Sequence, residues 1–67
     1  MKASLNQVSE LARFLKNDEI LKEHFPRIIW YDIVAGISEK QYKYILYLLY
    51  NNKRMKLRNL LNDLIKN

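Results

Sequence analysis

The sequence predicts an all-α protein, a compact orthogonal bundle of four or five short helices that forms a single helical domain over residues 1–67. Apolar residues recur with the spacing of helices along nearly the whole chain, whereas the alternation that is typical of strands is absent. The length suits one small domain, and a chain this short buries only about 60% of the surface that it exposes when unfolded. Because the chain has no cysteine, no disulfide supplements that small core.

The first helix is expected to begin after Ser4, whose side chain can cap it with Gln7 as the capping-box partner. Its core-facing residues are Leu5, Val8, Leu11, Ala12 and Leu15. Asn17 or Asp18 can then cap a short second helix. The inward residues of this second helix are Ile20, Leu21 and Phe25. It should end near Phe25, because the residue before a proline disfavours the helical conformation.

A third helix is predicted over residues 26–35. Pro26 suits its first turn, where the missing N–H has no effect, and Gly36 can end it in a left-handed conformation. This helix carries apolar or aromatic residues on nearly every side, namely Ile28, Ile29, Trp30, Tyr31, Ile33 and Val34.

The start of a fourth helix carries the clearest local signal in the chain. Ser38 can cap the helix, and Gln41 is placed to complete a capping box. Ile37 and Tyr42 flank this box as a hydrophobic staple. We expect the helix to run to about Tyr50.

Asn51 and Asn52 interrupt the apolar stripe and predict a break before a fifth helix over residues 53–65. Two asparagines are poor helix formers and adapt well to a left-handed turn. The alternative is one continuous rod, because Leu46 and Leu57 are only about 20° out of phase at about 100° per residue. The apolar residues of the fifth helix are Leu57, Leu60, Leu61, Leu64 and Ile65.

The fourth helix is also apolar or aromatic nearly all round. A sufficient core stripe consists of Tyr42, Ile45, Leu46 and Leu49. Three short neighbours do not readily enclose two helices of this kind, so some aromatic side chains should reach the surface. Because tyrosine and tryptophan are enriched in interfaces, we expect a protein-binding surface there. Its residues are Trp30, Tyr31, Tyr44, Tyr47 and Tyr50. The alternative is that the tyrosines belong to the core edge, with their hydroxyls in water.

Positive charge is concentrated in the second half of the chain. The net charge is +5, and residues 40–67 hold seven basic residues but a single acid. A basic end of this kind attracts an acidic protein surface or a nucleic acid and speeds the encounter with it. The candidate residues are Lys40, Lys43, Lys53, Arg54, Lys56 and Arg58. The alternative is a solvated face that only keeps a small protein soluble.

A helix-turn-helix frame can be laid on residues 28–47, with Gly36 in the turn. Its groove-facing residues would be Ser38, Glu39, Lys40, Lys43, Tyr44 and Tyr47. Asp32 departs from the frame, because such proteins usually have a small residue four positions before that glycine. Phosphate contacts would come from the basic cluster over residues 53–58, where bases at a helix start oppose the macrodipole.

Catalysis, metal binding and membrane insertion have little support in the sequence. His24 is the only histidine, and we expect it on the surface near a helix end rather than in a metal site. A single glycine cannot form a loop that cradles a nucleotide phosphate, so no cofactor is expected. The chain has no apolar run of about 18 residues and no apolar segment of a secretory signal at its start. A cytoplasmic location is therefore expected.

These patterns favour a small non-catalytic regulatory protein, an adaptor or inhibitor that docks on a larger intracellular protein. The docking surface would be the aromatic face of the third and fourth helices with its adjacent basic residues. Homodimerisation would be one form of such docking. The alternative is a dimeric, helix-turn-helix-like DNA-binding regulator that uses the fourth helix and the basic cluster. The abundance of Asn, Lys, Ile and Tyr fits an AT-rich coding sequence, such as that of a phage or mobile element.

Overall fold

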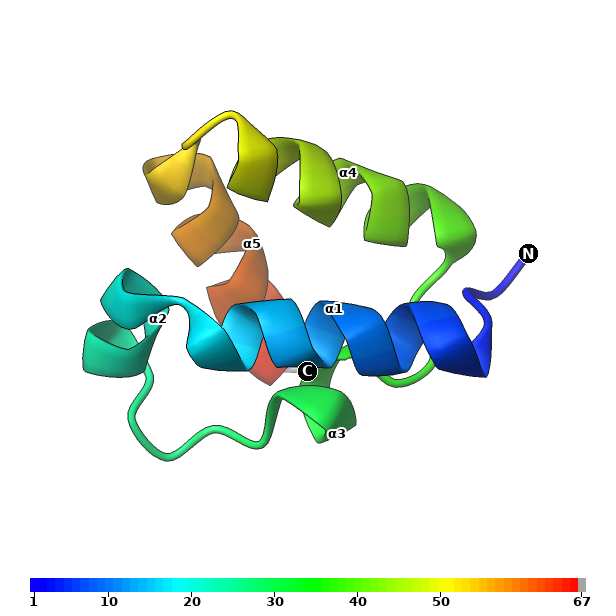
Figure 1. Ribbon diagram of the computed structural model, residues 1–67, viewed down its shortest axis with the longest axis horizontal. Helices are drawn as coiled ribbons and strands as arrows, with labels where there is room; N and C mark the ends of the chain where they lie inside the picture. Colours follow the sequence, from blue (N-terminus) through cyan, green and yellow to red (C-terminus); the bar gives the residue numbers. More distant parts are fainter. Residues whose placement is uncertain (67) are drawn as a thin grey trace.

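Five helices surround a small apolar core in the computed structural model, which describes residues 1–66 (Figure 1). In chain order they are α1 (Leu5–Asn17), α2 (Glu19–His24), α3 (Trp30–Val34), α4 (Glu39–Tyr50) and α5 (Arg54–Lys66). In Figure 1, α4 runs above α1 and α3 lies below it, while α5 passes behind α1. The molecule measures 30 × 24 × 21 Å. The predicted all-α bundle is confirmed.

The predicted starts of α1, α2 and α4 are confirmed by their capping hydrogen bonds. Ser4 and Gln7 form a reciprocal capping box at α1, in which the Gln7 N–H donates to Ser4 Oγ at 3.1 Å. Ser38 and Gln41 repeat this arrangement at α4. Asp18 caps α2, because its Oδ1 accepts hydrogen bonds from the first backbone N–H groups of that helix. These bonds satisfy donors that have no partner within the helix.

The N-terminal residues pair with the loop that leads into α4. The Ala3 N–H donates to the Ile37 carbonyl at 2.9 Å, and the Glu39 N–H donates to the Met1 carbonyl at 2.8 Å. The second bond satisfies a donor in the first turn of α4. The loop before α4 is therefore fixed from two sides, by the chain start and by the capping box.

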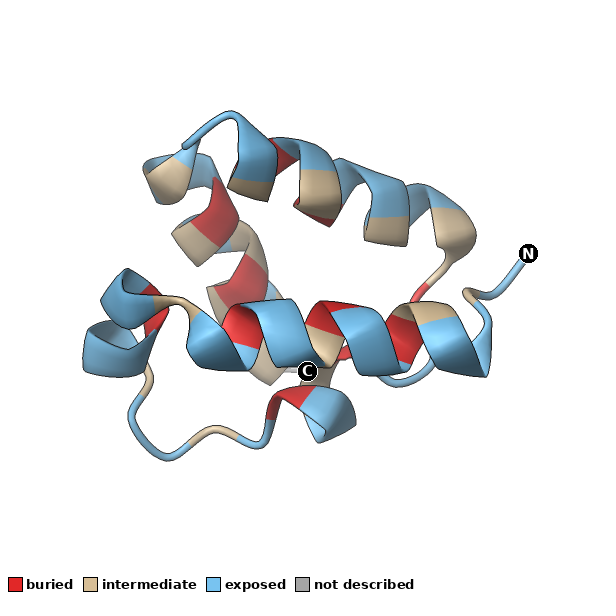
Figure 2. Cartoon of the chain, viewed as in Figure 1, coloured by how far each residue is buried: buried red, intermediate tan, exposed pale blue. Residues whose placement is uncertain are grey.

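The core consists of apolar side chains from all five helices. In Figure 2 the buried positions lie on the sides of the helices that face one another. The buried residues are Val8, Leu11, Leu15, Leu21, Trp30, Val34, Ile37, Ile45, Leu48, Leu57 and Leu61. Two residues that the sequence placed in this core, Leu5 and Ile20, are exposed instead. Each stands in the first turn of its helix, and the buried stripe of α1 begins one turn later, at Val8.

Helix α4 is rotated relative to the stripe that the sequence suggests. Ile45 is fully buried as expected, but Leu48, which lies outside the expected stripe, is only 1% exposed. Tyr42, Leu46 and Leu49 are only partly buried at the edge of the core. The reason is that α4 packs against both α5 and α1, so that its buried face is centred on Ile45 and Leu48.

The third helix is shorter than predicted. Instead of residues 26–35, it covers only Trp30–Val34, and Pro26 with Arg27 forms a turn before it. The rings of Phe25 and Trp30 meet edge to face, with centroids 5.5 Å apart and planes at 85°. In a continuous helix these two residues would point about 140° apart. The non-helical connection lets both rings pack in the core, and this packing overrides the local helix signal.

The break between α4 and α5 is present at the two asparagines. Asn52 has φ +52°, in the left-handed region. Its N–H donates to the Leu49 carbonyl at 3.4 Å, and the Lys53 N–H donates to the Leu48 carbonyl at 3.0 Å. This pair of bonds is the Schellman pattern that ends helices. The turn directs α5 back along the core, so that the continuous rod is excluded.

Substitutions of Asn52 test this turn. Asn52→Val should lower the free energy of unfolding by about 1–2 kcal/mol, because a β-branched side chain is strained in the left-handed region. Asn52→Gly should leave it within a few tenths of a kcal/mol or raise it slightly, because glycine adopts this conformation without strain. Urea unfolding followed by circular dichroism measures both values. Equal stability of the two variants would contradict the left-handed turn.

Candidate functional site

The outer side of α4 carries a row of exposed tyrosines and lysines. We call it the tyrosine–lysine face, and its residues are Lys40, Lys43, Tyr44, Tyr47 and Tyr50. Their spacing of three and four residues places them on one side of the helix over about 15 Å. The centre of that side lies nearly opposite the buried Ile45 and about 100° from the buried Leu48. Tyr44, Tyr47 and Tyr50 are 46%, 53% and 75% exposed, and their role in binding a protein stays a prediction.

Two of these tyrosines stack on each other. The ring centroids of Tyr44 and Tyr47 are 6.3 Å apart and their planes differ by 16°. Stacking limits the rotamers that each ring samples in the free protein, so that less freedom is lost when a partner covers them. Tyr42 differs from this pair, because it is partly buried at the core edge. Burial, together with the nearby charge of Glu10, raises the pKa of the Tyr42 hydroxyl.

A shallow pocket adjoins the end of the tyrosine–lysine face. It has a volume of about 200 Å³ and lies between α1 and α4. Its lining residues are Phe14, Asp18, Leu46, Leu49 and Tyr50. Tyr50 belongs both to the face and to the pocket wall, so the apolar surface continues from α4 onto Phe14 of α1. A partner side chain of modest size can enter here while the rest of the partner covers the tyrosines.

Trp30 and Tyr31 do not join this face, which corrects the expected surface of the third and fourth helices. Helices α3 and α4 lie on opposite sides of α1 in Figure 1. Trp30 is only 5% exposed and is part of the core, because its ring packs against Phe25. Tyr31 is 41% exposed but lines a different pocket, together with Arg13 and Lys16 of α1.

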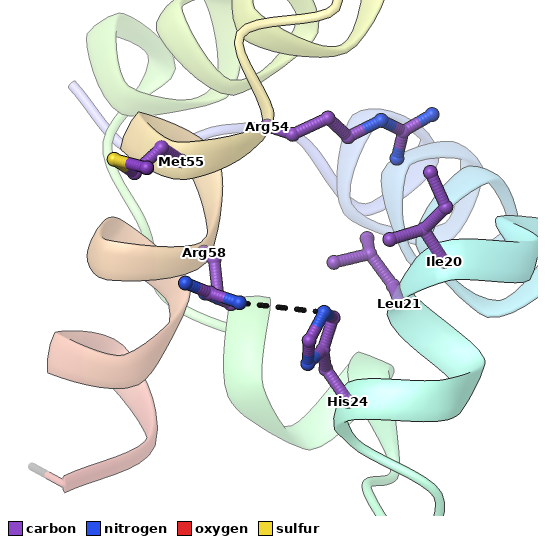
Figure 3. A pocket seen from close by; sticks show the side chains of 6 residues that line it. All are labelled: Ile20, Leu21, His24, Arg54, Met55 and Arg58. Carbon is purple, nitrogen blue, oxygen red and sulfur yellow. Dashed lines mark hydrogen bonds between the residues drawn. The ribbon is translucent and has the colours of Figure 1, made fainter.

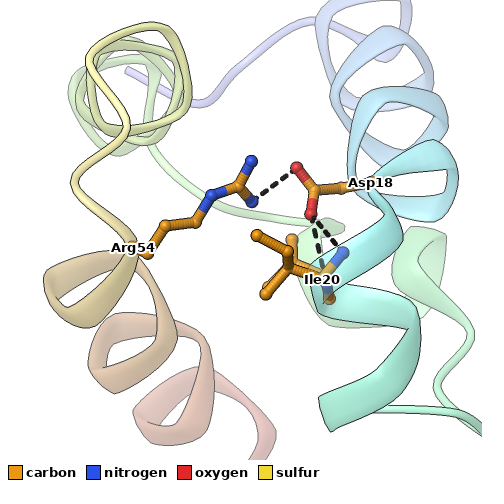
Figure 4. A network of polar contacts seen from close by, with 4 residues as sticks. Asp18, Ile20 and Arg54 are labelled. Atoms are coloured by element: carbon orange, nitrogen blue, oxygen red, sulfur yellow. Dashed lines mark hydrogen bonds and ion pairs between the residues drawn. The ribbon is translucent and has the colours of Figure 1, made fainter.

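The six candidate basic residues separate into different environments. Lys40 and Lys43 belong to the tyrosine–lysine face, and Lys53 and Lys56 are exposed at the start of α5. Arg54 instead pairs with Asp18 across the gap between α5 and α2 (Figure 4). This pairing gives a structural reason for a base at the start of α5, and the expected role of Arg54 in partner binding stays a prediction.

Asp18 links the end of α1, the start of α2 and the start of α5. Its Oδ1 accepts from the N–H groups of Ile20 and Leu21, while its Oδ2 accepts from Arg54 (Figure 4). Burial alone raises the pKa of the Asp18 carboxyl. The hydrogen bonds and charge of Arg54, with the two N–H groups, outweigh burial and bring this pKa below 3.8. The sequence predicts that Asp18 caps a helix, but it does not predict that Asp18 pairs with Arg54, 36 residues later.

Arg58 also turns toward α2. Its Nη1 lies 3.4 Å from Nε2 of His24, which is exposed at the end of α2 as the sequence suggests. Both side chains line a small pocket between α2 and α5 (Figure 3). The bases of residues 53–58 thus do not form a single ridge, as their positions on the helix predict, and their binding to a partner stays a prediction.

Within residues 1–66, no group of three or more histidine, cysteine or acidic side chains is arranged to hold a metal ion. None of the helices described for these residues combines the length and the apolar character that crossing a membrane requires. Comparisons with protein-family models, with curated protein sequences and with solved structures found no match.

The link between Asp18 and Arg54 should appear in the pH dependence of stability. Because the pKa of Asp18 is lowered in the folded state, its stabilising contribution is present above 3.8 and is lost as the pH falls through the folded-state pKa. Arg54→Leu should therefore lower the free energy of unfolding by about 1 kcal/mol at neutral pH, and by less in acid. Urea unfolding over a pH series measures the difference.

Lys56→Leu is the matched control for this link, because Lys56 is an exposed base on the same helix. It should change stability little at any pH. A loss in Arg54→Leu that is the same at neutral and acid pH would contradict the ion pair as its cause.

Proposed function

We propose that this protein is a small non-catalytic regulator that docks on a larger intracellular protein through the tyrosine–lysine face of α4. The observation that carries the proposal is the row of Tyr44, Tyr47 and Tyr50, exposed on one side of one helix beside Lys40 and Lys43. The tyrosines follow one another at intervals of three residues, and together with Lys40 and Lys43 they include the spacings of three, four and seven residues that helices binding in a groove present. Tyrosine is also among the residues that contribute most to binding energy.

A specific contact would cover the face together with its surroundings. A stable interface covers about 800 Å² on each partner. That is about one sixth of the 4922 Å² of accessible surface that this chain exposes. The tyrosines would form the centre of the interface, and the adjoining pocket with Phe14 and Tyr50 would extend it onto α1.

The charge of this region favours an acidic partner surface. No aspartate or glutamate occurs over residues 40–62. Lys40 and Lys43 flank the tyrosines and would speed the encounter with an acidic surface, while the buried aromatic area would supply most of the affinity. Association should therefore slow as the salt concentration rises.

DNA binding by α4 is the second candidate function. It is favoured by the same absence of acids over residues 40–62. Protein docking is favoured over it for two reasons. Helix α3 has only five residues, and α4 packs mainly against α5 and α1 rather than against α3 as a helix-turn-helix pair would. Its outer face also presents more tyrosines than bases.

Capture from a lysate of the native cells tests the proposal. The tagged chain is compared with the double variant Tyr44→Ala/Tyr47→Ala, with and without nuclease, and bound proteins are identified by mass spectrometry. Tyr31→Ala is the matched control, because Tyr31 is a tyrosine of similar exposure on the other side of α1. Urea unfolding should show losses of about 1 kcal/mol or less for both variants, because these side chains are exposed.

We expect one protein that survives nuclease, binds the Tyr31→Ala variant and is lost from the double variant. Loss of all captured material on nuclease treatment would support the DNA-binding alternative. Equal capture by the double variant and the unmodified chain would contradict the role of the tyrosine–lysine face.

A further inference from the structure

The pocket between α2 and α5 gathers three nitrogen-bearing side chains over an apolar floor. Its volume is about 160 Å³. The lining residues are Ile20, Leu21, His24, Arg54, Met55 and Arg58. Figure 3 shows the Arg58 guanidinium and the His24 ring directed toward each other across the pocket, whereas Met55 lies at its rim. None of these lining residues is acidic.

The two arginines of this pocket differ in how their charge is compensated. Arg54 is paired with the carboxylate of Asp18. For Arg58, the contact within the described part of the chain is Nε2 of His24, at 3.4 Å. A guanidinium has donors only, so this contact is a hydrogen bond only in the tautomer whose Nε2 carries no proton. This contact is long and leaves the positive charge of Arg58 without a negative partner there.

We propose that this pocket is a binding site for an oxyanion group, either a carboxylate or a phosphate, held between Arg58 and His24. A guanidinium matches two oxygens of such a group at once, and these charge-assisted bonds are about twice as strong as neutral ones. The oxyanion would replace the contact between Arg58 and His24, and Nε2 can then donate a third bond to it in the tautomer that carries the proton on Nε2. The start of α5 lies at the pocket rim, and a helix start favours negative charge.

The walls of the pocket add to the binding. Leu21 is buried beneath it, and Ile20 and Met55 are exposed apolar side chains on either side. Apolar surroundings strengthen a charged contact because they exclude water. They also suit a short apolar group attached to the oxyanion. A carboxylate with a short alkyl chain therefore fits the walls better than a bare ion, whereas phosphate offers more charge to Arg58.

This site is separate from the proposed docking surface. Helix α4 contributes none of the residues that line the pocket. A negative result for the oxyanion site would therefore not bear on docking by the tyrosine–lysine face. A negative result for docking would likewise not bear on the oxyanion site.

Titration followed by two-dimensional NMR tests the proposal. Sodium phosphate and sodium butyrate are added in separate experiments at constant ionic strength, and the signals of the His24 ring, the Arg58 side chain and the backbone are followed. The variants are Arg58→Gln and, as a second test of the site, His24→Ala, an exposed position. Lys56→Gln is the matched control, because it removes the same charge from an exposed position on the same helix.

We expect saturable shifts at His24, Arg58 and Leu21 for at least one of the two anions. Affinity should be retained in Lys56→Gln, weakened in His24→Ala, and about tenfold or more weaker in Arg58→Gln. Saturation by butyrate alone assigns a carboxylate as the ligand group, and saturation by phosphate alone assigns a phosphate. Shifts that do not saturate with either anion, or equal affinity of Arg58→Gln and the unmodified chain, would overturn the proposal.

Discussion

The burial of Ile45 and Leu48 between α1 and α5 decides the rest of this structure. Because α4 turns that side inward, its opposite side must face water, and three tyrosines stand there. The exposure of these tyrosines rises from Tyr44 to Tyr50, toward the end of the helix. The tyrosine–lysine face is thus a consequence of core packing, and no tyrosine on it is needed to fill the core.

Helix α1 has the second decisive role, because it lies between α3 and α4 (Figure 1). On the α3 side of α1, the ring of Trp30 is buried in the core. On the α4 side, the tyrosine–lysine face is exposed to solvent. The left-handed turn at Asn52 then places α5 beside α2. Two arginines of α5 reach α2 as a result, but among residues 1–66 only Arg54 meets a carboxylate. The chain therefore has two surfaces of different chemistry, one aromatic and one suited to an oxyanion.

Signals contained within a few residues predicted the structure well. The capping boxes at Ser4 and Ser38, the Asp18 cap and the break at Asn52 each depend on neighbours in sequence, and all are confirmed. The errors concern packing of side chains in the core, which local patterns do not determine. Packing of Phe25 against Trp30 shortened α3. Leu48 is buried because α4 packs against both α1 and α5.

The sequence predicted the part of the candidate site that lies on one helix, but not the parts that depend on how the helices pack. Tyr44, Tyr47 and Tyr50 share one helix, so their spacing alone places them together. Tyr31 lies on another helix, and only the three-dimensional arrangement shows that α1 separates it from them. The partners of Arg54 and Arg58 lie 36 and 34 residues away, beyond the reach of any local pattern.

The central claim is that a partner protein covers the outer side of α4. Photo-crosslinking in the native cells tests it most directly, with a crosslinking phenylalanine derivative placed once at Tyr47 and once at Tyr31. We predict one nuclease-resistant crosslinked protein from position 47 and none from position 31. Equal products from both positions, or none from position 47, would contradict the claim.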